Sequence, residues 1–281
     1  MHALRRRRLA LELHHQRVLA GLTGSEVAAR MDCSASKISR IETGRVPIAP
    51  RDARELARIY GLAPDRQEQL AQLARDARRT GWWEAYGDLL KPEQVWFLGL
   101  ESAAARLRIF EVGVIPGLLQ TSDYARAIID AALLGLPGPE LSRLVQITGS
   151  RQSVLTRRSP ATVAAIMDEA AIRRQVGGPQ VMRAQLTHLL AVAHAPNVDL
   201  QILPFSAGAG PSAGRPFVLL SFADPADGDF AFVHGQVTST CIDEPAGTGK
   251  YRQFFDRLSQ MSLSPAGSAT LISSILAGQR G

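Results

Sequence analysis

The chain contains 281 residues, 46% of them hydrophobic, and its formal net charge is +6. This length favours two domains over one, and the apolar content is enough for a substantial core. No segment approaches the roughly 18 uninterrupted apolar residues of a membrane-spanning helix and no signal peptide is recognisable, so we expect a cytoplasmic protein with no membrane contact. Cys33 and Cys241 fall in different predicted domains, so we expect no disulfide.

The positive charge is concentrated near the amino terminus. Residues 1–79 contain 16 Lys and Arg and 9 Asp and Glu, a net charge of +7, whereas residues 80–281 contain 16 and 17, a net charge of −1. Binding to DNA phosphates requires such a local excess of positive charge. The four arginines at 5–8 are either an arm along the DNA backbone or the solvated start of a helix.

Residues 22–45 predict two short helices joined by a tight turn. Thr23 and Glu26 have the spacing of a capping box at the start of the first helix. Ser34 is an N-cap candidate for the second helix, at about 35–43. The other helices expected nearby span about 5–20, 52–60 and 64–79, and they complete an all-α domain of five helices at residues 1–79.

The second of these short helices carries the most specific chemistry. Its apolar residues Ile38 and Ile41 face a core. The side chains left to solvent are polar or basic, namely Ser36, Lys37, Ser39 and Arg40. Such a face on a short helix fits the major groove of B-DNA, where Arg makes a bidentate pair with guanine and Ala contacts the thymine methyl group. The alternative interpretation is an ordinary solvated helix face.

One motif in this domain is specific enough to indicate a family. Residues 34–45 read S-x-S-x-I-S-x-I-E-x-G-R, and residues 21–23 read G-L-T. With this motif, residues 9–79 resemble the Cro/C1 (Xre-type) helix-turn-helix family. The resemblance implies base reading by Ala35, Ser36 and Arg40. It implies phosphate contacts by Lys37, Ser39 and Arg45, and also by Thr23 and Ser34, which are helix caps first. It places Arg17 and Glu42 as a buried ion pair between the first and third helices.

Two residues depart from the family pattern. Gly24 occupies a position at which the family often has a phosphate-binding Gln, so we expect one contact to the DNA backbone to be lost. Asp32 occupies a turn position at which Gly is common, and Asp is among the few other residues that tolerate a left-handed conformation.

Residues 80–110 are expected to connect the two halves of the chain. Trp82, Trp83 and Tyr86 lie close together there, beside two glycines. This aromatic cluster either docks the DNA-binding part against the rest of the chain or merely ends a helix. A long amphipathic helix is expected at 92–110.

Residues 111–281 predict an α+β domain. Strands are expected at 162–167, 198–203, 217–222, 229–233 and 236–242. Helices are expected at 122–134, 141–156, 179–195, 248–263 and 265–276. Because the last strands follow one another through short loops, we expect an antiparallel or mixed sheet with helices packed on it. The glycine-rich stretch at 207–214 is interpreted as a mobile hairpin connection.

Several motifs of this second domain also point to a family. They are I-P-G-L-L-Q-T at 115–121, M-D-E-A-A-I-R at 167–173 and I-L-P at 202–204. With them the domain resembles a C-terminal domain of unassigned function in actinobacterial regulators of the WhiJ-like kind. The resemblance implies a transcriptional regulator whose gene lies beside that of a small partner protein, in an antitoxin-like arrangement. Helices of this kind usually read operators made of two half-sites, one for each copy of the protein. We therefore expect a homodimer on double-stranded DNA.

Four residues of the second domain are candidates for holding a ligand or partner: Gln120, Arg151, Glu169 and Arg173. The alternative for Glu169 is a helix cap or a pair with an arginine. No residue set has the spacing of a metal site, a phosphate-binding loop or a catalytic triad, so we expect no metal, no cofactor and no enzyme activity. The rival interpretations are a DNA-tethered enzyme and the antitoxin-like half of a two-protein module.

Overall fold

The computed structural model describes residues 2–44, 46–77, 81–133, 135–209, 215–235 and 239–278. The chain forms two compact units, Met1–Ala103 and Ala104–Gly281. The first unit therefore continues past residue 79, where the DNA-binding domain was expected to end, and it includes most of the segment expected to be a linker.

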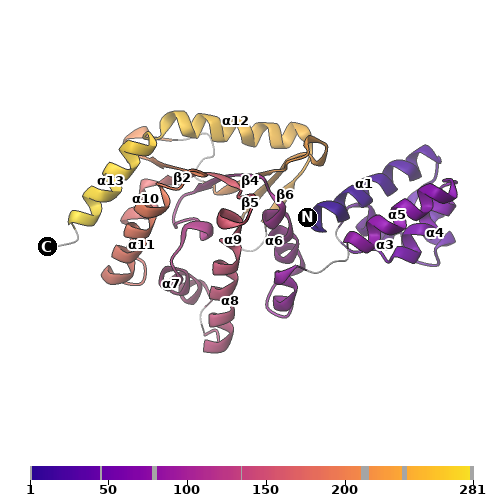
Figure 1. The fold of residues 1–281 in the computed structure, drawn as a ribbon, viewed down its shortest axis with the longest axis horizontal. Coiled ribbons are helices and arrows are strands. Elements are labelled where there is room, and N and C mark those ends of the chain that lie inside the picture. The colour runs from indigo at the N-terminus through magenta and orange to yellow at the C-terminus, as the bar shows by residue number, and fades with distance from the viewer. Residues whose placement is uncertain are drawn as a thin grey trace. The chain divides into compact units, whose positions relative to one another are not determined.

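The first unit begins with the helices expected from the sequence (Figure 1). They pack apolar residues at helical spacing into one core, which includes Leu9, Leu13, Ile38, Leu56 and Leu70. In the described part of this region the helices are α1 (His2–Leu19), α2 (Gly24–Arg30), α3 (Ala35–Glu42), α4 (Pro50–Ile59) and α5 (Pro64–Ala77). The predicted all-α domain of five helices is confirmed.

Local chemistry determines where α2 and α3 begin and end. The Thr23 hydroxyl accepts a hydrogen bond from the Glu26 amide at 3.2 Å, and the Thr23 amide donates to the Glu26 carboxylate at 2.7 Å. Ser34 Oγ accepts from the amide of Lys37 at 3.2 Å, as an N-cap does. Asp32, in the turn between the helices, has a left-handed φ of 49°. The predicted caps and turn are confirmed.

The helix expected at 92–110 ends earlier than predicted. Helix α6 spans Pro92–Ala103 and packs against α1 and the 3-10 helix η1 (Trp82–Tyr86), and strand β1 (Arg106–Glu111) follows it. The prediction was wrong beyond residue 103. Residues 106–109 alternate arginine with apolar side chains, which is the period of two that a half-buried strand requires.

The aromatic cluster beside α6 is part of the first unit. The Trp82 ring meets Trp83 and Tyr86 edge-on, with ring centroids 5.7 and 6.1 Å apart. The Trp83 side chain is buried. The cluster therefore belongs to the packed interior of this unit, and its expected docking role stays a prediction.

The second unit is built, within the described residues, on a mixed six-stranded sheet in the order β3-β2-β1-β4-β5-β6. Strands β1, β2 and β3 are parallel to one another, and β1, β4, β5 and β6 pair in antiparallel fashion. The predicted α+β class is confirmed, although β1 was missed. The other strands are β2 (Thr162–Asp168), β3 (Val198–Leu203), β4 (Phe217–Ser221), β5 (Phe230–His234) and β6 (Ser239–Ile242).

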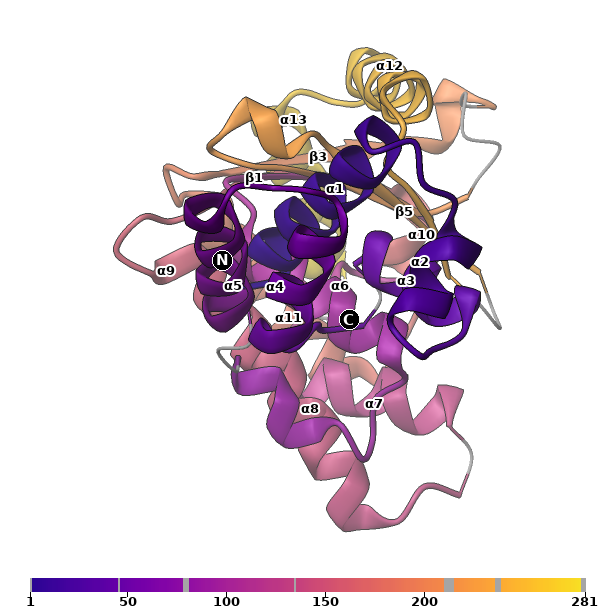
Figure 2. The ribbon, with the colours of Figure 1, turned by 90° about the vertical axis from the view of Figure 1, so that its right-hand side faces the viewer.

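Helices cover both faces of this sheet. Helix α12 (Pro245–Met261) lies on one face, and α7, α8 and α11 lie on the other (Figures 1 and 2). The remaining elements are α7 (Ser122–Ala132), α8 (Gly138–Arg151), α9 (Ser153–Thr156), α10 (Glu169–Arg173), α11 (Pro179–Val192), α13 (Pro265–Gly278), η2 (Gly117–Leu119), η3 (Phe205–Ala207) and η4 (Pro225–Asp227).

The predicted helices of this unit are confirmed, with differences in extent. The helix expected at 141–156 is divided into α8 and α9, and the short α10 was not predicted. Parts of three predicted segments lie outside the described residues: 134 in a helix, 210–214 in the glycine-rich connection and 236–238 in a strand.

Helix α12 packs onto one half of its sheet face. Its Phe255 and Leu258 contact a core that includes Phe110, Ile166 and Phe217. These three strand residues lie opposite one another in the sheet register. The Phe255 and Leu258 side chains of this helix are therefore part of the core, and the residues at the start of β1 occupy the other half of the face.

Candidate nucleic-acid interface

Helix α3 presents an exposed polar face because its sequence is amphipathic. Ile38 and Ile41 are buried in the core of the first unit. The exposed side chains include those expected to meet DNA, namely Ala35, Ser36, Lys37, Ser39 and Arg40. The three predicted base-reading residues thus lie together on one exposed helix of 8 residues.

The structure adds a residue to this face that the sequence reading missed. Ser36, Arg40 and Thr43 are spaced by four and then three positions, so their side chains lie on the same side of the helix. Thr43 is exposed, and its hydroxyl donates to the Ser39 carbonyl oxygen at 2.8 Å. The spacing of seven residues between Ser36 and Thr43 is the signal in the sequence that could have placed Thr43 on this face.

The predicted phosphate-contacting residues differ in how free their side chains are. The Thr23 hydroxyl donates to the Glu26 carboxylate at 2.7 Å while it accepts from the amide, so the capping box uses both of its functions. Ser34 Oγ acts only as an acceptor in its cap, which leaves its proton for a phosphate. Arg45 lies outside the described residues.

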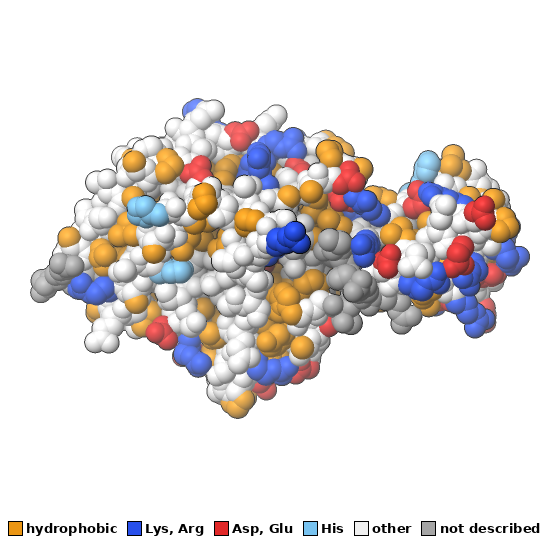
Figure 3. Space-filling view, viewed as in Figure 1, with side chains coloured by type: hydrophobic (Ala, Val, Ile, Leu, Met, Phe, Trp, Pro, Cys, Tyr) orange, Lys and Arg blue, Asp and Glu red, His pale blue; other side chains and the backbone are white. Residues whose placement is uncertain are grey.

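The cations of α3 differ from most other exposed cations of the first unit. On the face drawn in Figure 3, charged side chains are denser on the first unit than on the second. Many are paired, for example Arg58 with Glu55 at 2.6 Å and Arg66 with Glu12 at 2.7 Å. Among the residues that the structure describes, Lys37 and Arg40 have no such acidic partner. Their charges are available to DNA.

An ion pair connects α3 to α1. Arg17 Nε donates to Glu42 Oε1 at 2.7 Å and Arg17 Nη2 donates to Glu42 Oε2 at 2.9 Å, which is a bidentate contact. Arg17 Nη1 also donates to the Leu22 carbonyl oxygen at 2.7 Å. His14 Nδ1 lies 2.9 Å from Glu42 Oε2. The predicted pair of Arg17 and Glu42 is therefore present, and it holds α3 against α1.

The environment of this pair shifts the pKa values of Glu42 and of the neighbouring Tyr60. Burial acts to raise the pKa of Glu42, but hydrogen bonds from Arg17 and His14 outweigh burial and hold that pKa below its usual value. Burial, and then the negative charge of Glu42, raise the pKa of Tyr60. Because the folded-state pKa of Glu42 is lowered, its ion pair stabilises the fold above about pH 4.5, and this stabilisation is lost as the pH falls further.

In the second unit, Gln120 and Arg151 contact the turn that precedes α7. Gln120 is buried, and its Nε2 donates to the Ile115 carbonyl oxygen at 2.7 Å. A Cβ atom at Gly117 would lie 2.9 Å from Arg151 Nη1, so the glycine admits the guanidinium. Both predicted residues therefore help to hold this turn in place.

Glu169 and Arg173 contact each other instead. Arg173 Nε donates to Glu169 Oε1 at 2.5 Å, and Glu169 Oε2 accepts from the amide of Phe205 at 2.8 Å. Burial acts to raise the pKa of Glu169, but these hydrogen bonds outweigh it and lower that pKa. Of the alternatives for Glu169, pairing with an arginine is confirmed, and Asp168 is the residue that caps α10.

A further titratable group of this region was missed by the sequence reading. Burial raises the pKa of Glu111, the last residue of β1, to about 7, and the nearby charge of Arg151 offsets part of the effect. The charge of Glu111 also contributes to a raised pKa of Tyr124, whose first cause is burial and whose hydroxyl accepts from the Ile115 amide at 3.2 Å. Because most of β1 was predicted to be helical, the sequence did not indicate that Glu111 ends a strand and has a raised pKa.

The described residues contain no group of three or more His, Cys, Asp and Glu side chains that could hold a metal ion. No helix among them is long and apolar enough to cross a membrane.

Comparisons with known proteins divide the chain in a similar way. The family described as a helix-turn-helix domain matches residues 8–73, which include α2, α3 and their turn. The family described as a domain of unknown function (DUF5753) matches residues 95–274, more than half of the chain. No curated protein and no solved structure matches the chain.

We predict that Arg17→Ala lowers the free energy of unfolding of the first unit by about 3 kcal/mol, because it leaves the Glu42 carboxylate buried without its cation. The three tryptophans all lie in the first unit, so urea unfolding followed by tryptophan fluorescence reports on it. Arg54→Ala is the control, since it breaks an exposed pair with Glu68 and should cost less than about 1 kcal/mol. Equal effects of the two variants would contradict the role given to the Arg17 pair.

We predict that the second unit of the natural chain loses roughly 2–3 kcal/mol of stability between about pH 4.5 and pH 8. The pKa of Glu111 is about 7 in the folded protein and about 4.5 in the unfolded chain, so the unfolded chain loses this proton first as the pH rises. The free energy of unfolding therefore falls as the pH rises through 7. Glu111→Gln should remove this pH dependence in urea unfolding followed by far-UV circular dichroism. Asp199→Asn, which changes an exposed carboxylate on β3, should leave it unchanged.

Proposed function

This chain belongs to the DUF5753 family, and on that premise we propose that it is a sequence-specific transcriptional regulator that reads DNA through α3. Its helix-turn-helix domain is that of a DNA-binding regulator. The observation that carries the proposal is the exposed, unpaired polar and basic face of α3, held in a defined orientation by the Arg17–Glu42 ion pair.

The dimensions and chemistry of α3 support this role. A helix of 8 residues is about 12 Å long, which is close to the width of the major groove of B-DNA. In the proposed complex Ala35, Ser36 and Arg40 meet base edges. Phosphates are contacted by Ser34, Lys37 and Ser39, and we propose Arg45, which lies outside the described residues, as a further phosphate contact. Thr23 keeps only its role as a helix cap, because its capping box uses both functions of the hydroxyl.

We propose a homodimer as the active form. A single α3 reads only a few base pairs, and two copies on half-sites about one helical turn apart give a longer operator. The WhiJ-like, Xre-type resemblance supports a cytoplasmic regulator whose second unit binds a ligand or a small partner protein, as in antitoxin-like pairs. We propose that this unit acts by binding rather than by catalysis.

The central prediction concerns Arg40. Selection of bound sequences from random duplexes should give a defined operator for the natural chain. Arg40→Ala should lose about 1–3 kcal/mol of binding free energy for each guanine contact and should relax the base preference at that position.

The matched control is Arg75→Ala, which removes the same charge from the exposed side of α5. It should retain the operator and nearly all of the affinity. If Arg40→Ala selects the same sequences with unchanged affinity, α3 does not read bases through this residue and the proposal fails.

A second prediction separates phosphate contacts from base contacts. Lys37→Ala should weaken binding to all duplexes alike and reduce the slope of log K against log salt by about 1, because one phosphate contact is removed. Fluorescence anisotropy at several salt concentrations measures the slope. Lys250→Ala, an exposed lysine on α12, is the control and should leave the slope unchanged.

A further inference from the structure

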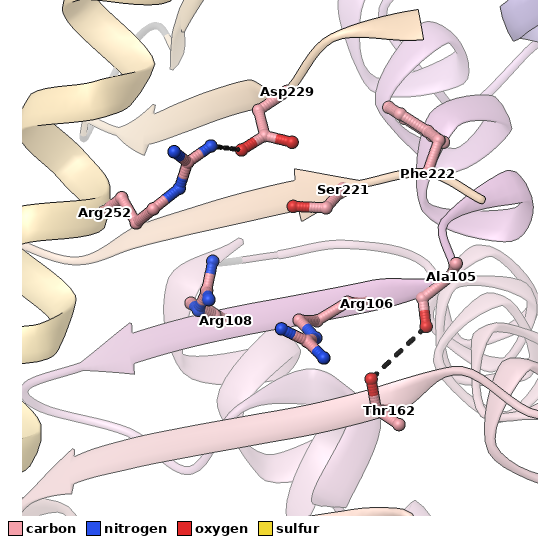
Figure 4. Close-up of a pocket in the computed structure, with 8 residues that line it drawn as sticks. All are labelled: Ala105, Arg106, Arg108, Thr162, Ser221, Phe222, Asp229 and Arg252. Carbon is pink, nitrogen blue, oxygen red and sulfur yellow. Dashed lines mark hydrogen bonds and ion pairs between the residues drawn. The ribbon is translucent and has the colours of Figure 1, made fainter. Parts of the chain in front are cut away.

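A pocket of about 400 Å³ opens on the α12 side of the sheet in the second unit. It lies where α12 leaves the strands uncovered, and Figure 4 shows its lining. We call it the sheet-face pocket and define it by Arg106, Arg108, Ser221, Asp229 and Arg252, with Phe222 beside them.

The sheet register brings these side chains together. Arg106 and Arg108 are two positions apart on β1, so both point to the same face. Arg106 lies opposite Ser221 of β4 in the register. Arg252 extends from α12 toward Asp229 (Figure 4). Three guanidinium groups from a strand and a helix therefore line one hollow.

The charges in this pocket are not balanced. Arg252 forms an ion pair with Asp229, whose side chain is 14% exposed. Among the described residues, Arg106 and Arg108 have no acidic side chain as an ion-pair partner, and the guanidinium carbon of Arg108 lies 6.0 Å from the centroid of the Phe255 ring. With Asp229 engaged by Arg252, two positive charges of the lining remain uncompensated.

This imbalance affects the half-buried Arg108 in particular. Burial, followed by the positive charge of Arg106, lowers the pKa of Arg108, and Arg252 acts in the same direction. Asp256 and Asp229 oppose these effects only in part. A bound anion would relieve both the desolvation of this cation and the repulsion among its neighbours.

We propose that the sheet-face pocket binds a phosphorylated small molecule, with Arg106 and Arg108 on the phosphate oxygens and the Ser221 hydroxyl as a further donor. The planar fork of Arg suits phosphate oxygens, and a phosphate monoester carries close to the two negative charges that the lining leaves unmatched. Phe222 also lines the pocket, and its ring packs edge-on against Phe230, with ring centroids 5.8 Å apart.

The shape of the pocket favours a small ligand over nucleic acid. A volume of about 400 Å³ falls within the range of small-molecule sites. The arginines converge on one hollow, whereas a DNA backbone needs cations spread along its length. The site is therefore distinct from the DNA-reading face of α3 and does not depend on it.

Isothermal titration of the full chain with pyrophosphate and with ADP tests the proposal. We expect saturable binding of at least one of these probes. Arg106→Gln should weaken it at least tenfold, and because Arg106 is exposed this variant should fold normally. Arg257→Gln, which removes an exposed charge from the same α12 outside the pocket, should change the affinity less than twofold.

The same titration in the Arg40→Ala background separates this proposal from the proposed function, because that variant alters only the DNA-reading face. Retained binding there supports an independent ligand site. The proposal is overturned if neither probe binds, or if Arg106→Gln and Arg257→Gln weaken binding equally. It is also overturned if Arg106→Gln leaves the binding of both probes unchanged and impairs only the binding of duplex DNA or of an acidic peptide.

Discussion

The bidentate contact between Arg17 and Glu42 is the interaction on which the orientation of α3, the helix proposed to read DNA, depends. One guanidinium group binds the last residue of α3 and the Leu22 carbonyl oxygen just before α2, so it joins three parts of the first unit. Because Glu42 is buried, this contact is screened little by water or salt. The apolar residues of α3 then fix which face of the helix is turned outward.

Arginine serves two purposes in each unit, and its surroundings decide which. Arg17 is held by a buried carboxylate and is structural. Arg40 is exposed on α3, has no acidic partner among the described residues and is suited to an external anion. In the second unit, Arg252 is held by Asp229, while Arg106 and Arg108 beside it are not held in this way. Among the described residues, arginines without an acidic partner are the common feature of both proposed sites.

The two proposed sites lie in different compact units, which limits how one can influence the other. A ligand of the second unit changes DNA affinity only if it binds two arrangements of the chain with different affinities. A coupling of 1–3 kcal/mol, about 5- to 150-fold in affinity, is typical of such regulation. In such a mechanism, ligand binding alone shifts the balance between the arrangements.

The helix-turn-helix was determined by the sequence itself, because its signals are local. The Thr23 capping box, the Ser34 cap, the left-handed Asp32 and the spacing of Ile38 and Ile41 each act within a few residues. Strand β1 was decided only by tertiary structure, since its partners β2 and β4 lie 56 and about 110 residues further along the chain. The sheet-face pocket and the half-buried Glu111 both depend on that strand. The alternation at 106–109 fits a strand, but four residues are too few to distinguish a strand from a helix without the distant partners, so neither site was found from the sequence.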